Sequence, residues 1–224
     1  PVEIDTDGVY YVPPEGATPA TQAAFRKAFS ESLPAGIEIE FDGEYAAMFS
    51  YKMKNYALLS GDGAVTIKGA ALKSRGLEPF QRKFLKDMIR LKLEGRDEEL
   101  PSLRKQYEQS IMGREWPVTM LAKTETLQDS PATYAAKISE KGRGRNAGYE
   151  LALRSGRDYR AGDQLSYYVA GGKKTVQVFA AARLVSEWNP VERDENVPYY
   201  LDKLHALYEK FCGGKLGGTG SDDE

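Results

Sequence analysis

The chain has 224 residues, of which 41% are hydrophobic and 29% charged, and its formal net charge at pH 7 is −2. This composition permits a packed core and excludes a globally disordered chain, and the length suits one large domain or two small ones. No apolar run is long enough to cross a bilayer, the acidic start lacks the basic region of a signal peptide, and a single cysteine excludes an internal disulfide, so we expect a cytoplasmic protein.

The first third of the chain predicts a small antiparallel sheet. A hairpin is expected over Glu3–Val12, because Asp7-Gly8 lies between β-forming residues. Thr18-Pro19 predicts the start of a helix whose apolar face carries Phe25, Phe29 and Leu33. Further strands are predicted over 37–40, 45–51, 56–59 and 65–68, where apolar and polar residues alternate or β-formers cluster.

From about residue 78 the pattern becomes helical. Helices are predicted over 79–95, 98–111, 130–141 and 149–154, and a last helix from Pro198 places Tyr200, Leu204, Leu207 and Phe211 inward. A hairpin is expected between 164–169 and 175–179, around Gly171-Gly172. The glycine-rich acidic segment 213–224 is predicted to be a flexible tail. The predicted fold class is therefore α+β, a small antiparallel sheet followed by a mostly helical domain with a β-hairpin.

The first motif with chemical content is Asp5-Thr6-Asp7. Two carboxylates two residues apart on a tight turn lie close together, and a divalent cation that also binds phosphate relieves their repulsion. Hard oxygen ligands of this kind suit Mg²⁺. An ordinary acidic hairpin turn has the same sequence, and the motif alone does not decide between the two interpretations.

The second motif lies around Lys52, Lys54 and Tyr56. If this segment is a strand, the three side chains alternate and share one face. Basic and aromatic groups on one face suit a sugar-phosphate backbone or a base edge, whereas a solvated strand face is the alternative interpretation.

The third motif is a basic, glycine-rich loop that contains Arg143, Arg145 and Asn146. Glycines allow close approach of the backbone to a phosphate, and arginine binds phosphate through two hydrogen bonds. The loop lacks the Lys-Ser/Thr ending of a P-loop, and a flexible surface loop is the alternative. Basic residues outnumber acidic ones by ten to three over 52–92 and by seven to three over 137–160, so the near-neutral total does not exclude a polyanionic partner.

The order of these motifs resembles family B DNA polymerases. That family has an Asp-Thr-Asp motif before a strand and, about forty-five residues later, a Lys-x-Tyr motif, here Lys54-Asn55-Tyr56. A Lys-Gly pair with an arginine follows before a long helix, matching Val65–Gly76, and later features match Gly162–Val169 and the paired Tyr199-Tyr200. The resemblance covers nearly the whole chain before the tail, and departures at Gly8, Met53 and Ser74 indicate a divergent subgroup.

The resemblance implies a fragment of a longer polymerase, and a first residue that is Pro1 rather than Met agrees with that. It implies a palm part over 1–78, a DNA-gripping thumb over 79–212, and an incomplete two-metal Mg²⁺ site with Asp5 and Asp7 as ligands. Lys54 would contact the minor groove of the primer-terminal pair and Tyr56 the backbone beside it. Phosphate contacts are expected from the remaining basic and amide residues, which are Arg75, Arg143, Arg145 and Asn146.

The implied partners are primer-template DNA, deoxynucleoside triphosphate, and upstream palm, fingers and possibly exonuclease domains. The fragment alone should not extend primers. Two other classes of protein use similar residues. A glycosyltransferase could hold a metal-bound nucleotide-sugar with Asp5 and Asp7, but only four residues precede Asp5 here. A non-catalytic nucleic-acid-binding module derived from a polymerase is the other alternative.

Overall fold

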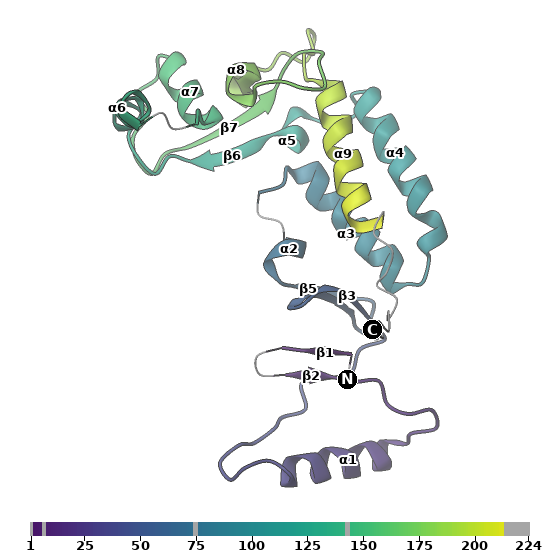
Figure 1. Ribbon diagram of the computed structural model, residues 1–224. Coiled ribbons are helices and arrows are strands. Elements are labelled where there is room, and N and C mark those ends of the chain that lie inside the picture. Colours follow the sequence, from purple (N-terminus) through teal and green to yellow (C-terminus); the bar gives the residue numbers. More distant parts are fainter. Residues whose placement is uncertain (1, 6–7, 74–75, 142–143, 213–224) are drawn as a thin grey trace, which may run out of the picture. The chain divides into compact units, whose positions relative to one another are not determined.

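The computed structural model describes residues 2–5, 8–73, 76–141 and 144–212 (Figure 1). Within these ranges the fold is α+β, with helices and three small antiparallel sheets, which confirms the predicted class. The chain divides into two compact units. Unit 1 comprises Pro1–Lys73 and Lys92–Gly95, and unit 2 comprises Ser74–Leu91 and Arg96–Glu224. None of the described helices is both long and apolar enough to span a membrane.

Unit 1 contains two of the sheets. Strands β1 (Glu3–Ile4) and β2 (Val9–Tyr10) form the predicted hairpin. Strands β3 (Ala47–Lys52), β4 (Asn55–Leu59) and β5 (Val65–Lys68) form an antiparallel sheet in chain order, and the short helix α2 (Ala70–Lys73) follows β5. The buried core of this unit consists mainly of Tyr56, Ala57 and Leu58 of the middle strand β4, together with Leu72 of α2.

Helix α1 (Pro19–Glu31) begins where the sequence predicts, because Thr18 and Thr21 form a reciprocal capping box and Pro19 occupies the first turn. Its apolar face is covered only in part, because Tyr11 lies 5.4 Å from Phe25 but Phe25 and Phe29 remain 54% and 41% exposed. The predicted strand over 37–40 is wrong. Its alternating residues are solvent-exposed and no described strand pairs with them, so the pattern has no sheet to join.

The helices of unit 2 pack on a shared apolar core. The helices on this core are α3 (Pro79–Leu93), α4 (Leu100–Met112), which follows the 3₁₀ turn η1 (Asp97–Glu99), and α9 (Val197–Cys212), the last helix of the described residues. Phe84 lies 4.8 Å from Tyr107 between ring centroids, and Phe80 meets Tyr200 edge-on at 5.9 Å. The four residues predicted to face inward from the last helix are all buried, namely Tyr200, Leu204, Leu207 and Phe211.

A three-stranded antiparallel sheet forms the other part of unit 2. Its strands are β6 (Lys123–Thr126), β7 (Gln164–Val169) and β8 (Ala182–Leu184), and β7 is the middle strand. Short helices α5 (Val118–Leu121) and α8 (Val178–Ala181), the 3₁₀ turn η2 (Val185–Glu187), and the longer helices α6 (Pro131–Lys141) and α7 (Ala147–Arg154) complete the unit.

The predicted hairpin between 164–169 and 175–179 is only half correct. Gln164–Val169 is a strand, but it pairs with β6 and β8. Val178 and Phe179 instead open helix α8 and pack on a core formed by α7 and the sheet. The two apolar residues that suggested a returning strand are therefore half-buried members of a helix.

Candidate functional site

Three predicted site residues that are up to 51 positions apart meet in unit 1. The hydroxyl of Tyr56 donates a hydrogen bond to Asp5 Oδ2 at 3.2 Å, and Lys54 Nζ lies 3.8 Å from Asp5 Oδ1. Asp5 follows β1, where its N–H donates to the carbonyl of Gly8 and closes the hairpin. Asp7 lies outside the described residues, as do Arg75 and Arg143.

Tyr56 is buried, with 3% of its surface exposed, and its ring meets Tyr10 edge-on at 5.3 Å. Burial, together with the hydrogen bonds to Tyr10 and Asp5, raises the pKa of the Tyr56 phenol well above its ordinary value. The phenol therefore stays protonated and acts as a donor to the carboxylate. Tyr56 thus holds Asp5 in place from inside the sheet.

Lys54 does not lie in a strand, so the predicted alternation of Lys52, Lys54 and Tyr56 along one face is wrong. It occupies the tight turn between β3 and β4 with φ of 61°, a left-handed conformation that costs an L-residue about 1–2 kcal/mol. The turn projects an exposed ammonium group beside Asp5, which a strand position would not do.

Two contacts fix this turn. The carboxylate of Glu3 accepts the Lys54 N–H at 3.2 Å and the Ser50 hydroxyl at 2.6 Å. Behind the turn Gly69 has φ of +88°, and a side chain there would overlap the Lys54 carbonyl oxygen and Asn55. Sequence reasoning missed Glu3 and Ser50, although Glu3 and Asp5 were readable as carboxylates two residues apart.

The described residues around Asp5 do not by themselves form a Mg²⁺ site. Mg²⁺ prefers six oxygen ligands in octahedral geometry, whereas the described part of the chain holds no group of three or more acidic, histidine or cysteine side chains placed to bind a metal. Both Asp5 oxygens already contact Tyr56 or Lys54. A metal here would need further carboxylates.

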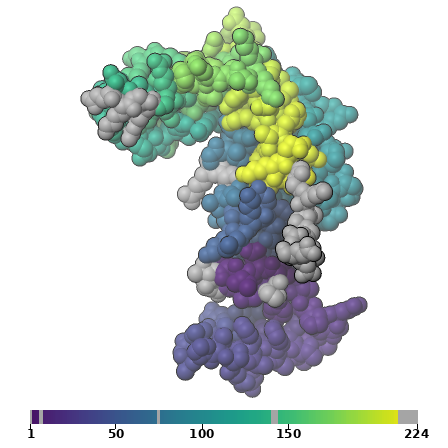
Figure 2. Space-filling view, in the orientation of Figure 1, coloured from purple at the N-terminus to yellow at the C-terminus, as the bar shows by residue number. Residues whose placement is uncertain are grey.

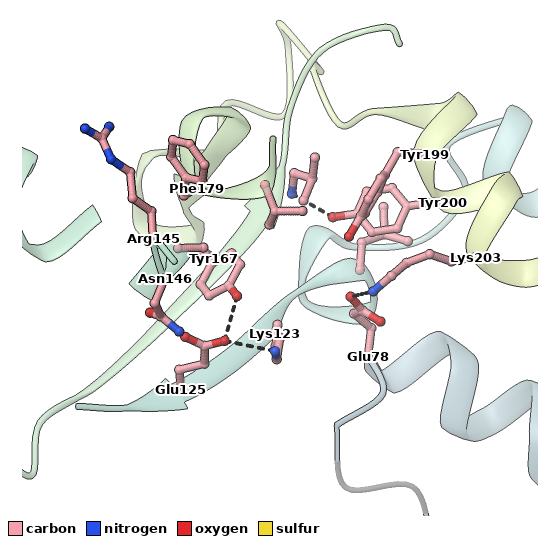
Figure 3. A pocket seen from close by; sticks show the side chains of 14 residues that line it. Glu78, Lys123, Glu125, Arg145, Asn146, Tyr167, Phe179, Tyr199, Tyr200 and Lys203 are labelled. Atoms are coloured by element: carbon pink, nitrogen blue, oxygen red, sulfur yellow. Dashed lines mark hydrogen bonds and ion pairs between the residues drawn. The ribbon is translucent and has the colours of Figure 1, made fainter. Parts of the chain in front are cut away.

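The other described candidates, Arg145 and Asn146, lie in unit 2. Asn146 caps α7, because its side-chain oxygen accepts the N–H of Tyr149 at 3.1 Å. Arg145 precedes the cap with an exposed guanidinium, 3.8 Å from Glu150 and 5.4 Å above the Phe179 ring. Both residues line a pocket of about 350 Å³ (Figure 3).

The pocket contains further charged residues that sequence reasoning missed. Glu125 accepts hydrogen bonds from Lys123 at 2.9 Å and from Tyr167 at 2.8 Å. Burial opposes ionisation of Glu125, but these bonds and one from Asn146 outweigh it, so the pKa of its carboxyl lies below the ordinary value. A Cβ at position 148 would come within 2.7 Å of Glu125 Oε2, so a larger residue in place of Gly148 would displace this carboxylate. The sequence signal that could have found Lys123 and Glu125 was the alternation of charged residues with threonines over Lys123–Thr126.

The fold has a counterpart among solved structures. No family model matches the chain. It superposes with a TM-score of 0.67 on the structure of the family B DNA polymerase from the hyperthermophilic archaeon Pyrobaculum calidifontis, at 18% identity, over 92% of this chain and 26% of that one. It is also 24% identical over 212 residues to a DNA polymerase of Methanocaldococcus jannaschii, covering 89% of this chain and 12% of that protein.

The chain is therefore a distant homologue of the family B DNA polymerases, and it spans only a small part of their length. The homology extends across both units rather than a single motif.

Proposed function

We propose that this chain is the C-terminal part of a family B DNA-directed DNA polymerase, with a palm portion over 1–78, a thumb over 79–212 and a tail over 213–224. The observation that carries the proposal is the meeting of Asp5, Lys54 and Tyr56 at one place, in a chain homologous to these enzymes. The parent reaction would be template-directed addition of a deoxynucleotide to a primer 3′ end.

Asp5 and Asp7 would contribute carboxylates to a Mg²⁺ site that other acidic residues of the parent complete. When bound, the ions would stabilise charge on the reacting phosphate. Lys54 would contact the minor groove of the primer-terminal pair, where acceptors occur in every base pair. Its exposed ammonium supports this role, and the buried Tyr56 would position Asp5 as well as support the backbone contact.

Primer phosphates would be bound by the remaining basic and amide residues. Arg145 is exposed and adjoins the cap of α7, which supports such a contact. Arg75 and Arg143 stay predictions from the resemblance, and Asn146 would act through its position at the helix start. A DNA partner would agree with the cytoplasmic location expected from the sequence.

The parent would also supply an upstream palm segment, fingers and possibly an exonuclease domain, and deoxynucleoside triphosphate would be its second substrate. Most of the large hydrophobic side chains that the structure leaves exposed fall within residues 2–41 of unit 1, shown in purple and dark blue in Figure 2. Phe25 and Phe29 stack on one face of α1, and Tyr11 lies 5.4 Å from Phe25. A contiguous apolar face of this kind marks a contact surface, and we assign it to the upstream palm.

A non-catalytic DNA-binding module derived from a polymerase is the second candidate. It is favoured by the contacts of Asp5, whose oxygens face Tyr56 and Lys54. Both functions predict DNA binding, and they differ in whether the acidic residues matter for primer extension.

Asp7→Ala in the full-length protein that carries this chain decides between the two. We expect primer extension to be lost while affinity for primer-template stays near normal, because Asp7 would hold metal and not grip DNA. Asp62→Ala, which removes a carboxylate from the exposed turn between β4 and β5, is the matched control and should extend normally. Near-normal extension by Asp7→Ala, or no extension by the unaltered protein, would favour the binding module.

A further inference from the structure

Glu3 of β1 contacts the turn that carries Lys54 through both oxygens of its carboxylate. Oε1 accepts the Lys54 N–H at 3.2 Å, and Oε2 accepts the Ser50 hydroxyl at 2.6 Å. Because Glu3 lies in the β1–β2 hairpin and Ser50 in β3, these bonds join the two sheets of unit 1. The partners are 47 and 51 positions away in sequence, so the contact forms only when unit 1 folds.

Two carboxylates hold the same lysine at opposite ends. Glu3 accepts the backbone N–H of Lys54, and Asp5 Oδ1 lies 3.8 Å from its ammonium. Residues two positions apart in a strand share a face, and Ile4 between the two carboxylates is 60% exposed, as that alternation requires. The ammonium of Lys54 can therefore leave Asp5 while the backbone of the turn stays attached to the hairpin.

The turn needs this attachment because its conformation is unfavourable. Lys54 has φ of 61°, and residues in the left-handed region persist only where the surrounding structure fixes them. The Asn55 side chain fixes one side of the turn, since it donates to the Met53 carbonyl at 3.0 Å and accepts the Ala71 N–H of α2 at 2.8 Å. Glu3 fixes the other side, where the Lys54 N–H meets the hairpin.

The charge of Glu3 opposes DNA binding, whereas its position favours it. A carboxylate close to the lysine that would contact DNA repels a polyanion, and over 1–51 acidic residues outnumber basic ones by nine to two. The same carboxylate accepts two hydrogen bonds that fix the turn, and bonds to a charged acceptor are stronger than bonds to a neutral one. Because these two effects have opposite signs, substitutions that separate the charge of Glu3 from its reach distinguish them.

We propose that Glu3 is a positioning residue of the proposed polymerase, which holds the Lys54 turn at a fixed distance from Asp5 while the ammonium moves from Asp5 to the minor groove of the primer-terminal pair. Glu3 acts through Lys54, and it would contact neither DNA nor metal. The inference rests on the proposed function and adds a connection between the metal-binding hairpin and the primer-binding turn. Tyr56 supports the same arrangement from the side of Asp5.

The test compares two conservative substitutions in the full-length protein that carries this chain. Glu3→Asp keeps the charge but shortens the side chain by about 1.5 Å, which takes the carboxylate out of hydrogen-bonding reach of the Lys54 N–H. We expect primer-template affinity, measured by fluorescence anisotropy, to fall about tenfold, the effect of losing one hydrogen bond to a charged group. Glu3→Gln removes the charge but keeps an oxygen that can accept the Lys54 N–H, so its affinity should equal or exceed that of the unaltered protein.

A double-mutant cycle with Lys54 separates positioning from a general structural role. In a Lys54→Ala background, Glu3→Asp should cause no further loss of affinity, because the ammonium that Glu3 positions is absent. A merely structural role would lower the affinity by the same factor in both backgrounds. The matched control is Glu44→Asp, the same substitution at an exposed position of unit 1, which should leave primer-template affinity unchanged.

Several results would overturn the inference and leave the proposed function intact. They are an unchanged affinity in Glu3→Asp, equal losses in Glu3→Asp and Glu3→Gln, and the same loss from Glu3→Asp with and without Lys54. Failure of the unaltered protein to bind primer-template at low salt would instead overturn the proposed function, and the role of Glu3 with it.

Discussion

The two units differ in how completely they bury their own apolar side chains. In unit 2, Phe80, Phe84, Ile89 and Leu204 are all fully buried, and three helices and a sheet share the core. In unit 1 the best-buried residues are those of one strand, β4, and Leu72 of the short helix α2, and helix α1 has no buried residue. Unit 2 therefore has an extensive core of its own, whereas we expect the exposed apolar face of α1 in unit 1 to be covered by a partner surface, proposed above to be the upstream palm.

Two substitutions, one in each unit, test this difference in burial most directly. Leu204→Ala should lower the free energy of unfolding by about 2–5 kcal/mol, because it leaves a cavity in unit 2. Phe25→Ala should change it by less than about 0.5 kcal/mol, because the ring is 54% exposed. Urea unfolding followed by far-UV circular dichroism measures both. A loss of several kcal/mol in Phe25→Ala would show that unit 1 has a core of its own.

The next prediction separates the charge of Lys54 from its backbone conformation. Lys54→Ala and Lys54→Gly both remove the ammonium, so each should weaken primer-template binding by about 1.5–3 kcal/mol. Only glycine relieves the positive φ, so Lys54→Gly should be about 1 kcal/mol more stable to urea than Lys54→Ala. Anisotropy and urea titration measure the two quantities. Wild-type DNA affinity in both variants would assign Lys54 to a solvated turn.

The contribution of unit 2 to DNA binding can be measured through salt. If on the order of four phosphates are contacted, the slope of log affinity against log salt should be about −3 to −4. Changing Arg143 and Arg145 together to Ala should make the slope shallower by about one to two units and weaken all sequences alike. Changing Arg157 and Arg160 together is a matched control from the same basic block. An unchanged slope in the Arg143 and Arg145 variant would remove the loop from the DNA-binding surface.

The smallest expected effect concerns pH and Glu125. Its lowered pKa means that the folded state favours the charged carboxylate, so its contribution to stability is present above the ordinary value near 4.5 and is lost as pH falls through the lowered pKa. Tryptophan emission reports this in unit 2, which contains both Trp116 and Trp188. Between pH 6 and pH 3, Glu125→Gln should lose less stability than the unaltered chain. Parallel pH profiles would contradict the assigned hydrogen bonds.

The sequence predicted helices best where a cap and an apolar period agree. Thr18-Pro19 and Ser130-Pro131 mark helix starts that the structure confirms, and the four inward residues of α9 follow the helical period. Prediction from the sequence failed where contacts between distant parts of the chain decide the secondary structure. Strand β8 has three residues, too few for a periodic pattern, and β6 is largely polar, so the true partners of β7 were not recognisable.

The order of the motifs selected the residues of the candidate site, but it did not predict their geometry. Motif order singled out Asp5, Lys54 and Tyr56, and the structure places these three side chains together, whereas local alternation placed Lys54 wrongly on a strand face. The turn depends on Glu3 and Gly69, and no local pattern indicates that these residues contact the turn at Lys54. The pocket of unit 2 is lined by six separate chain segments, and no single stretch of sequence reveals it.

Gly69 has a consequence for how this sequence can vary. Because a side chain at position 69 would overlap the backbone at Lys54 and Asn55, and because the Asn55 side chain in turn accepts the Ala71 N–H at 2.8 Å, these positions cannot change independently. A bulkier residue at position 69 is compatible only with a longer or differently bent turn at 53–55. Related sequences should therefore show correlated substitutions between that turn and the start of α2, even where the ammonium group of residue 54 is kept.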